Sequence, residues 1–295
     1  MNYPKISIIT PSYNQAQYLE DTILSVLGQF YPNLEYMIYD GESTDGSVEI
    51  IKKYENNLFY WESKKDKGQS DAINKGFAKS TGDILMWLNS DDILMPNTLY
   101  FIANQFLEKG DGIYYGNCIH FEEVSSGVNS FGSNVKRQFK IEPLEISDPI
   151  IQPSTFWSRK VWVENGKLDE DLHYGFDWEW FLRAKSKGIS FHVINKTLSL
   201  YRIHERHKTS NGGEKRKQEL LKIYEPKYQN LYELIKKEKL INSKLERVIY
   251  LFCKYILKIN FTSGILLKII KKNKYKAYTI NEINCLRLFL GLHKK

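Results

Sequence analysis

The segment 81–92, TGDILMWLNSDD, constrains the fold of this chain most strongly. Its centre, from Ile84 to Leu88, is mostly apolar, which is typical of a strand buried on both faces of a parallel sheet. Two adjacent carboxylates, Asp91 and Asp92, follow that strand. A buried charge is costly unless it is paired or binds a metal, and open α/β sheets bind ligands beyond the carboxyl ends of their strands. The pattern indicates a divalent-cation site that carries a phosphate-bearing ligand. The alternative is that Asp92 caps a following helix.

Strand-like and helix-like segments alternate before this point. Apolar runs predict strands over about 5–10, 34–39, 58–62 and 83–88, and helical spacing predicts helices over about 16–29, 46–54 and 70–79. Repeated strand–helix–strand units favour a Rossmann-like α/β fold, with a mostly parallel central sheet flanked by helices. Later segments predict a strand at 112–121, a hairpin or loop over 122–150, helices at 159–165 and 176–188, and one or two strands over 191–204.

Charge divides the chain into two regions. Residues 214–295 hold 20 basic and 7 acidic residues, whereas residues 1–213 hold 22 basic and 28 acidic residues. We expect a main domain at 1–213 and a basic helical C-terminal region at 214–295. The basic region suits an anionic membrane surface, and packing against the body or another subunit, as in a homo-oligomer, is an equal alternative. Nucleic acid is not expected as a partner, because no nucleic-acid motif accompanies the charge.

Cysteine usage and the N-terminus predict the compartment. The three cysteines have no disulfide or metal spacing, which indicates free thiols in a reducing cytosol. The sequence has no secretory signal at its start and no apolar stretch of about 20 residues that would span a membrane. We expect a cytoplasmic protein, peripheral at the inner membrane face if the basic region binds lipid.

Four polar groups follow predicted strands or lie in loops on the same side of the sheet. They run from Thr10 to Asn14, at Asp40, from Asp66 to Asp71 and from Asn89 to Asp92. Each alone is compatible with ordinary turn chemistry. Because parallel strands end at one edge of the sheet, we expect the four groups to converge there.

In order and spacing, these segments resemble the family 2 glycosyltransferases, which have the GT-A fold. The resemblance covers about residues 4–207, through 7–47, 66–92, QPSTFWSRKVW at 152–162, YGFDWEWFLRA at 174–184 and YRIH at 201–204. It implies a nucleotide-sugar donor at the carboxyl edge of the sheet. Pro11 and Tyr13 would lie along the base, Asp40 would accept a hydrogen bond from the base edge, and Asp66 and Lys67 would lie by the nucleotide or diphosphate.

The resemblance also implies a metal site. Asn89, Ser90 and Asp91 occupy the position of the DxD motif of the family, so that Asp91 is the best metal ligand and Asn89 faces the ribose or the metal. His204 matches a histidine that completes the metal site in some relatives, and the planar fork of Arg202 suits the diphosphate. Carboxylate oxygens favour Mg²⁺ or Mn²⁺, which would bridge the diphosphate.

The acceptor side follows by the same match. Asp177 occupies the position of the general base of the family, with Glu179 as the alternative, and direct attack by the acceptor hydroxyl inverts the anomeric centre. Trp178 and Trp180 offer flat faces for a sugar ring, and packing in the core is the competing interpretation. Gln152 matches a position near the donor sugar and the acceptor.

We therefore expect a metal-dependent, inverting glycosyltransferase of the hexosyltransferase type. It would move a sugar, with UDP as the expected nucleotide, to a hydroxyl of a glycan or lipid-linked saccharide in surface-polysaccharide synthesis. The alternatives are a nucleotidyltransferase, although the N-terminal loop lacks a glycine-rich, basic phosphate grip, and a binding scaffold on a degenerate body. Two departures from the family pattern bear on this: Asn89 replaces a carboxylate, and Glu42 adds bulk to the turn after Asp40.

Overall fold

The computed structural model describes residues 3–135, 144, 149–204, 208 and 213–224. By compactness, the chain divides into one unit of Met1–Leu144 with Asp148–Arg216 and a second of Glu145–Ser147 with Lys217–Lys295. Apart from helix α8 (Gly213–Tyr224), the expected basic C-terminal region lies outside the described residues. Its boundary at residue 213 stays a prediction.

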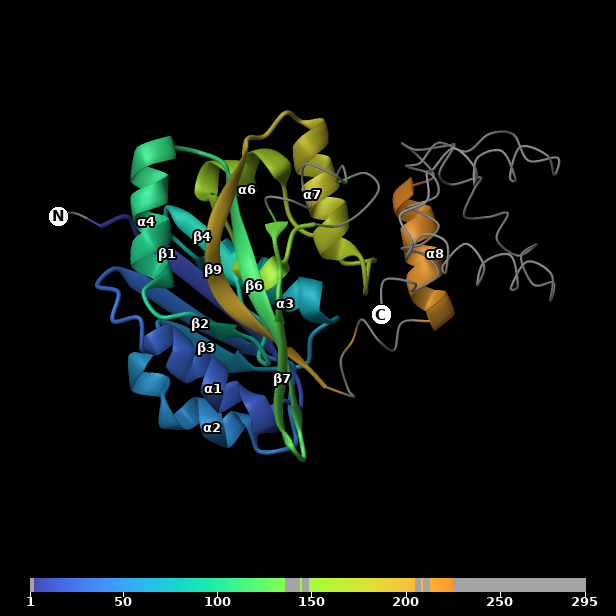
Figure 1. The fold of residues 1–295 in the computed structure, drawn as a ribbon. Coiled ribbons are helices and arrows are strands. Elements are labelled where there is room, and N and C mark those ends of the chain that lie inside the picture. The colour runs from blue at the N-terminus through green and yellow to red at the C-terminus, as the bar shows by residue number, and fades with distance from the viewer. Residues whose placement is uncertain (1–2, 136–143, 145–148, 205–207, 209–212, 225–295) are drawn as a thin grey trace. The chain divides into compact units, whose positions relative to one another are not determined.

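The N-terminal part contains the predicted strand–helix alternation (Figure 1). Four parallel strands lie in the order β3-β2-β1-β4. Their bounds are β1 (Ile6–Ser12), β2 (Leu34–Asp40), β3 (Tyr60–Ser63) and β4 (Ile84–Trp87). The helices between them are α1 (Ala16–Leu27), α2 (Ser47–Lys53) and α3 (Gln69–Lys79), with a 3₁₀ turn, η1 (Glu55–Asn57), before β3. The α/β prediction is confirmed.

The sheet continues beyond β4 with mixed strand directions, in the order β4-β8-β6-β9-β5, and β7 pairs with β6. Strand β8 is antiparallel to β4 and β6, whereas β6 and β9 are parallel. The strands are β5 (Ile93–Leu94), β6 (Ile113–Val124), β7 (Gly127–Gly132), β8 (Thr155–Ser158) and β9 (Phe191–Ile203). The helices are α4 (Thr98–Lys109), η2 (Gln152–Ser154), α6 (Arg159–Asn165) and α7 (Phe176–Ser186). Strands β5 and β8 and helix α4 were not predicted from the sequence.

The interpretation of Asp92 as a helix cap is wrong. Strand β5 follows Asp92 directly, and the next helix begins only at Thr98. A proline at position 96 disfavours helical backbone in the residue before it, so the chain stays extended. Ile93 pairs with Leu200 of β9 as a result.

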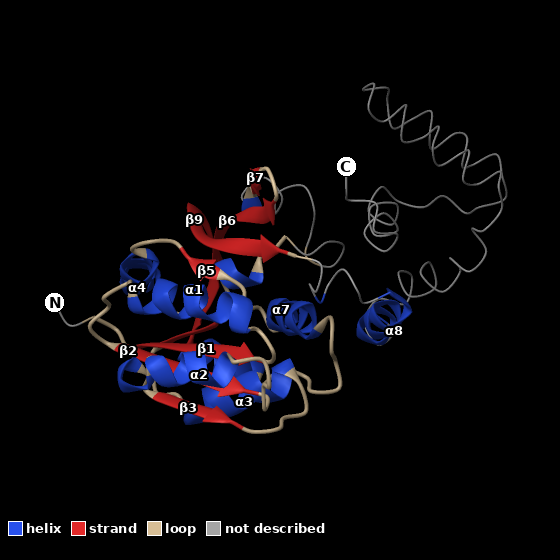
Figure 2. Cartoon of the chain, turned by 90° about the horizontal axis from the view of Figure 1, so that it is seen from below, coloured by secondary structure: helices blue, strands red, loops and turns tan. Residues whose placement is uncertain are grey.

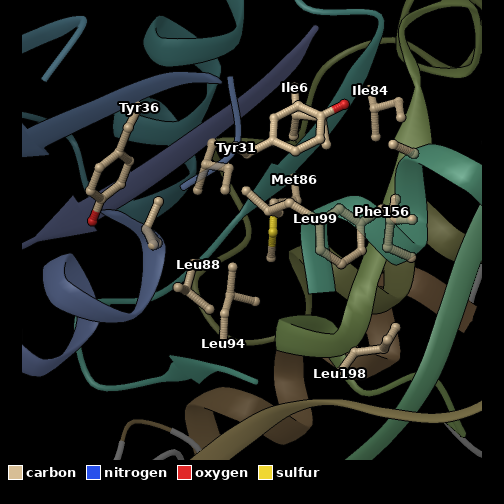
Figure 3. Packing of buried hydrophobic residues seen from close by; sticks show 14 of the residues in the cluster. Ile6, Tyr31, Tyr36, Ile84, Met86, Leu88, Leu94, Leu99, Phe156 and Leu198 are labelled. Carbon is tan, nitrogen blue, oxygen red and sulfur yellow. The ribbon is translucent and has the colours of Figure 1, made fainter. Parts of the chain in front are cut away.

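The two faces of the sheet are covered by different helices (Figure 2). Ile8 of β1 belongs to the apolar cluster that includes Leu19 and Ile23 of α1, part of which is drawn in Figure 3. The next residue, Ile9, faces α3 because side chains alternate along a strand. A methyl group added at Gly76 of α3 would lie 2.5 Å from Ile9 Cγ2, so glycine permits this close approach.

An aromatic cluster fills the face that carries α3, α6 and α7. Trp157 of β8 lies 5.0 Å from Trp180 of α7 and 5.1 Å from Trp87 of β4, measured between ring centroids. Trp180 is fully buried and donates to the carbonyl of Gly166 at 2.8 Å. The core-packing interpretation of Trp180 is therefore confirmed. Among the described helices, none has the length and apolar character of a membrane span.

Candidate functional site

The first part of the site is the turn that follows β2. Asp40 ends this strand and is buried, with only 2% of its surface exposed. It accepts hydrogen bonds from the Ser43 backbone amide at 2.9 Å, the Ser43 hydroxyl at 2.5 Å and the Ser63 hydroxyl at 2.7 Å. A carboxylate offers about four acceptor positions, so the turn and Ser63 of β3 occupy three of them and fix the carboxylate.

Three predicted nucleotide residues meet around Gly41. A methyl group at Gly41 would lie 3.0 Å from Asp66 Oδ2 and 3.3 Å from the ring of Tyr13. The Tyr13 ring is 64% exposed, which leaves a flat face for stacking, and Pro11 lies in register with Tyr39 at the end of β1. The structure thus brings Asp40, Asp66 and Tyr13 together at the carboxyl edge of the sheet.

A carboxylate and an imidazole form the candidate metal pair. Asp91 follows β4 and His204 follows β9, and Asp91 Oδ2 lies 3.1 Å from His204 Nε2. Two adjacent ligands of one octahedral ion lie about 3 Å apart, because each bond is about 2.1 Å long. Within the described residues no group of three His, Cys, Asp or Glu side chains is arranged for a metal. The pair fits Mg²⁺ or Mn²⁺ held by two protein ligands together with diphosphate oxygens and water.

Asn89 belongs to an amide network beside this pair. It accepts from Gln69 Nε2 at 2.7 Å and donates to Asp92 Oδ2 at 3.2 Å and to Gln152 Oε1 at 3.4 Å. Gln152 in turn donates to the Trp87 carbonyl at 2.7 Å. An ionised carboxylate at position 89 could not donate. The amide of Asn89 therefore has a structural reason, and its predicted role toward ribose or metal stays a prediction.

Asp92 is the buried member of this network, with 1% of its surface exposed. Burial, and then the neighbouring charge of Asp91, raises the pKa of Asp92 well above its ordinary value. Its Oδ1 has no hydrogen-bond partner among the described residues. Burial thus disfavours the charged form of Asp92, and its contacts suit a structural role. The adjacent Ser90 is also buried, and its predicted donor contact remains a prediction.

Arg202 has other partners than the expected diphosphate. Its guanidinium is ion-paired with Asp21 of α1 at 2.7 Å and with Glu123 of β6 at 2.5 Å, and its Nε points to the Asp91 carbonyl at 3.4 Å. The Lys67 side chain is 78% exposed, and its ammonium lies 3.7 Å from Glu170 in a surface ion pair. The expected positions of Arg202 and Lys67 beside the diphosphate stay predictions.

The acceptor side is built at the start of α7. Asp177 accepts from the Trp178 backbone amide at 2.8 Å, and burial raises the pKa of Asp177 above its ordinary value. Glu179 instead pairs with Arg183 one turn later, at 2.9 and 3.0 Å. The Trp178 ring is only 6% exposed and donates to the Leu144 carbonyl, which leaves little surface for a sugar. Of the two candidate bases, the geometry favours Asp177.

One residue of the site, Lys208, was missed by sequence reasoning. Lys208 donates to Gln69 Oε1 at 2.9 Å, and its ammonium lies 5.3 Å from the Phe176 ring centroid. The positive charge of Lys208 also acts to lower the pKa of Asp177, against the larger effect of burial. Lys208 links the start of α7 to the Asn89 network through Gln69. The only sequence signal was its place four residues after His204, in a segment with no motif.

The chain is similar to known glycosyltransferases. Residues 7–165 match the model of glycosyl transferase family 2. A Rickettsia typhi relative, named an uncharacterised glycosyltransferase, is 28% identical over 220 residues, which cover 71% of this chain and 67% of the relative. TuaG of Bacillus subtilis, whose name assigns it to teichuronic acid biosynthesis, is 40% identical over 94 residues, or 30% of this chain and 36% of TuaG. The chain spans less than half the length of several curated relatives that it matches.

Solved structures share the fold. TarS of S. aureus in complex with UDP-GlcNAc has a TM-score of 0.60 at 18% identity, over 97% of this chain and 80% of that chain. The mannosyltransferase PcManGT of Pyrobaculum calidifontis, in complex with GDP-Man and Mn²⁺, has a TM-score of 0.61 at 14% identity, over 100% and 89%. The fold is GT-A, and the chain belongs to glycosyl transferase family 2 and is a glycosyltransferase.

Proposed function

We propose that this glycosyltransferase moves a sugar from a UDP-linked donor to a hydroxyl of a glycan or lipid-linked saccharide, with inversion and with Mn²⁺ or Mg²⁺ as cofactor. The observation that carries the proposal is the Asp91–His204 pair, 3.1 Å apart at the carboxyl edge of the sheet. It joins a hard oxygen ligand to an imidazole, which together suit Mn²⁺. The complexes of TarS with UDP-GlcNAc and of PcManGT with GDP-Man and Mn²⁺ support this combination in the shared fold.

The donor half of the mechanism belongs to the edge formed by β1, β2 and β4. Tyr13 offers a ring face to the base, and Asp40 would accept a hydrogen bond from a base N–H donor. Asp91 and His204 would hold the metal. When bound, it neutralises charge that develops on the departing diphosphate. The ammonium of Lys208, held by Gln69, adds a positive charge on the side of α7.

The acceptor half belongs to Asp177. A general base works best when its pKa is near the working pH, and burial moves the pKa of this carboxylate upward in that direction. Asp177 would take the proton of the acceptor hydroxyl as its oxygen attacks the anomeric carbon. One displacement on the face opposite the leaving group inverts that carbon.

The setting is also a proposal. The name of TuaG supports the synthesis of a cell-surface polysaccharide. A lipid-linked acceptor would place the enzyme at the inner face of the membrane, with the basic residues beyond position 224 as the contact with anionic lipid. Those residues lie outside the described chain, so that this contact rests on sequence alone.

Calorimetric titration with UDP, GDP and dTDP, each with and without Mn²⁺, tests the donor. We expect micromolar, metal-dependent binding of UDP by the wild type and loss of the metal dependence in Asp91→Asn. Asp111→Asn is the matched control, because Asp111 is exposed and its ion pair within the described part of the chain is with Lys160 alone. Metal-dependent binding of GDP instead would change the donor class. Absence of binding of all three nucleotides would favour the alternative of a non-catalytic binding scaffold.

A further inference from the structure

Arg202 lies among more partners than a phosphate ligand needs. Its side chain is 4% exposed, although both of its carboxylate partners are more than half exposed. Nη2 pairs with Asp21 at 2.7 Å, and Nη1 pairs with Glu123 at 2.5 Å. The guanidinium carbon lies 4.9 Å from the Tyr18 ring centroid and 4.7 Å from that of Phe121, within the range of cation–π attraction.

These contacts surround the guanidinium with acceptors. Three of its five N–H donors are used, because Nη1, Nη2 and Nε each have one acceptor. The two remaining donors lie on Nη1 and Nη2, beside Asp21 and Glu123, so a diphosphate bound there would meet the negative charge of both carboxylates. Arg202 is therefore badly placed to bind the donor directly.

The same contacts connect both halves of the candidate metal pair. The Asp91 carbonyl belongs to the residue that supplies the carboxylate, and His204 comes two residues after Arg202, just past the end of β9. The Tyr18 ring lies against both Arg202 and His204, because it is also 4.7 Å from the His204 ring. The Arg202 side chain, near the end of β9, therefore contacts three other segments: helix α1, the C-terminal half of β6 and the loop after β4.

We propose that Arg202 is a positioning residue, which holds Asp91 and His204 at their mutual distance by tying α1 and β6 to the loop after β4, and that it is not a ligand of the diphosphate. This inference rests on the proposed function for the use of the Asp91–His204 pair. Partners that orient metal ligands commonly change metal affinity by about 10- to 100-fold when they are removed. Loss of the Arg202 contacts should therefore lower the affinity for the metal.

Four variants distinguish a positioning role of Arg202 from direct binding of phosphate by Arg202. Arg202→Lys keeps the charge and loses the planar fork, which makes two ion pairs at once. Asp21→Asn and Glu123→Gln each remove the charge of one partner, which is more than half exposed, and leave Arg202 with its other carboxylate. Glu122→Gln is the matched control, because Glu122 is the exposed neighbour of Glu123 on the same strand.

The measurements are Mn²⁺ affinity by electron paramagnetic resonance, alone and with saturating UDP, and UDP affinity by calorimetry in EDTA. We expect Mn²⁺ affinity to fall about tenfold or more in Arg202→Lys and measurably in Asp21→Asn and Glu123→Gln. Glu122→Gln should match the wild type, and UDP affinity in EDTA should be unchanged throughout. Thermal unfolding of each variant identifies any general loss of structure.

Three results would overturn the inference. Loss of UDP affinity in EDTA by Arg202→Lys, with normal binding by Asp21→Asn and Glu123→Gln, would make Arg202 a phosphate ligand. A lowered unfolding temperature with unchanged Mn²⁺ affinity would leave it a purely structural residue. Absence of Mn²⁺ binding by the wild type in both conditions would remove the pair that it is said to hold. Failure of the proposed function can be told apart from failure of this inference. A wild type that binds Mn²⁺ but no nucleotide would refute the proposed nucleotide-sugar donor, and the effect of Arg202 on Mn²⁺ affinity could still be measured.

Discussion

Replacing Asp177 by asparagine tests the assignment of the general base. Asparagine keeps the shape of the side chain and the Oδ1 acceptor for the Trp178 amide, so the start of α7 should not move. It removes the ability to accept a proton from the acceptor hydroxyl. Because burial disfavours the charged form of Asp177, the neutral amide should leave the free energy of unfolding at neutral pH unchanged or higher.

The expected magnitude follows from the role. General base catalysis contributes about 10²- to 10⁴-fold to a rate, so kcat should fall by that factor. This is equivalent to about 3–5 kcal/mol in the activation free energy. Donor affinity should be unchanged, since the nucleotide contacts expected here come from other elements.

The pH dependence of kcat gives a second, independent test of Asp177 as the general base. An ordinary aspartate has a pKa of about 3.9, and burial raises the pKa of Asp177 above that value. The base must be ionised to act, so kcat of the wild type should fall as the pH falls through this raised pKa. The acid limb should lie above the ordinary range of aspartate, and it should disappear in Asp177→Asn.

Glu179→Gln is the matched comparison. Glu179 lies two residues further along α7 and is held by Arg183 in an i,i+4 pair, so that its loss should reduce stability by about 0.3–0.5 kcal/mol and leave kcat near the wild-type value. Initial rates of sugar transfer over pH 4–9, with a saturating donor, measure all three enzymes. Equal losses in both variants, or an active Asp177→Asn with an unchanged acid limb, would refute the assignment of Asp177.

Two further changes test the support of the site. Gly76→Ala should destabilise the fold by up to about 2 kcal/mol, because the added methyl meets Ile9 at 2.5 Å and overpacking outweighs a gain in helix propensity of about 1 kcal/mol. Ile9→Ala should be less harmful in that background than alone, and simple additivity in denaturant unfolding would contradict the contact. Lys208→Met should lower kcat and move the acid limb to higher pH, because the lysine charge lowers the pKa of Asp177. Lys196→Met, at a lysine over the ring of Phe101, is the control, and an unmoved limb would contradict the placement of Lys208.

The strands of the parallel block could be predicted because their signal is local. Each is a short apolar run between turn residues, and the observed bounds differ from the expected ones by about two residues. Strand β5 could not be found in this way. It has two residues, and its pairing with Leu200 and Ser199 of β9 depends on contacts that no local pattern contains. Helix α4 did carry a local signal, in the helical spacing of Leu99, Ile102 and Ala103.

The residues of the candidate site likewise fall into those that the sequence could predict and those that it could not. Asp40, Asp91 and Asp177 could be named from the sequence, because each stands at the end of a strand or the start of a helix within a motif. The partners of Arg202 could not, since Asp21 is 181 residues away and Glu123 lies on a strand whose register is set by its neighbours. Residue type predicted a phosphate contact there and could not show the two carboxylates that tertiary packing places beside the guanidinium.

Asn89 stands where the family motif has an acidic residue, and the charges at the carboxyl edge of the sheet explain this difference. Asp91 and Asp92 are already adjacent, and burial together with the Asp91 charge raises the pKa of Asp92. A third carboxylate at position 89 would add like charge and would have no proton to donate to Asp92 or Gln152. The amide removes that repulsion and accepts from Gln69, which also holds Lys208. The Asn89 amide is thereby linked through Gln69 and Lys208 to the start of α7, where Asp177 lies, so that residues after β4 and residues of α7 belong to one network.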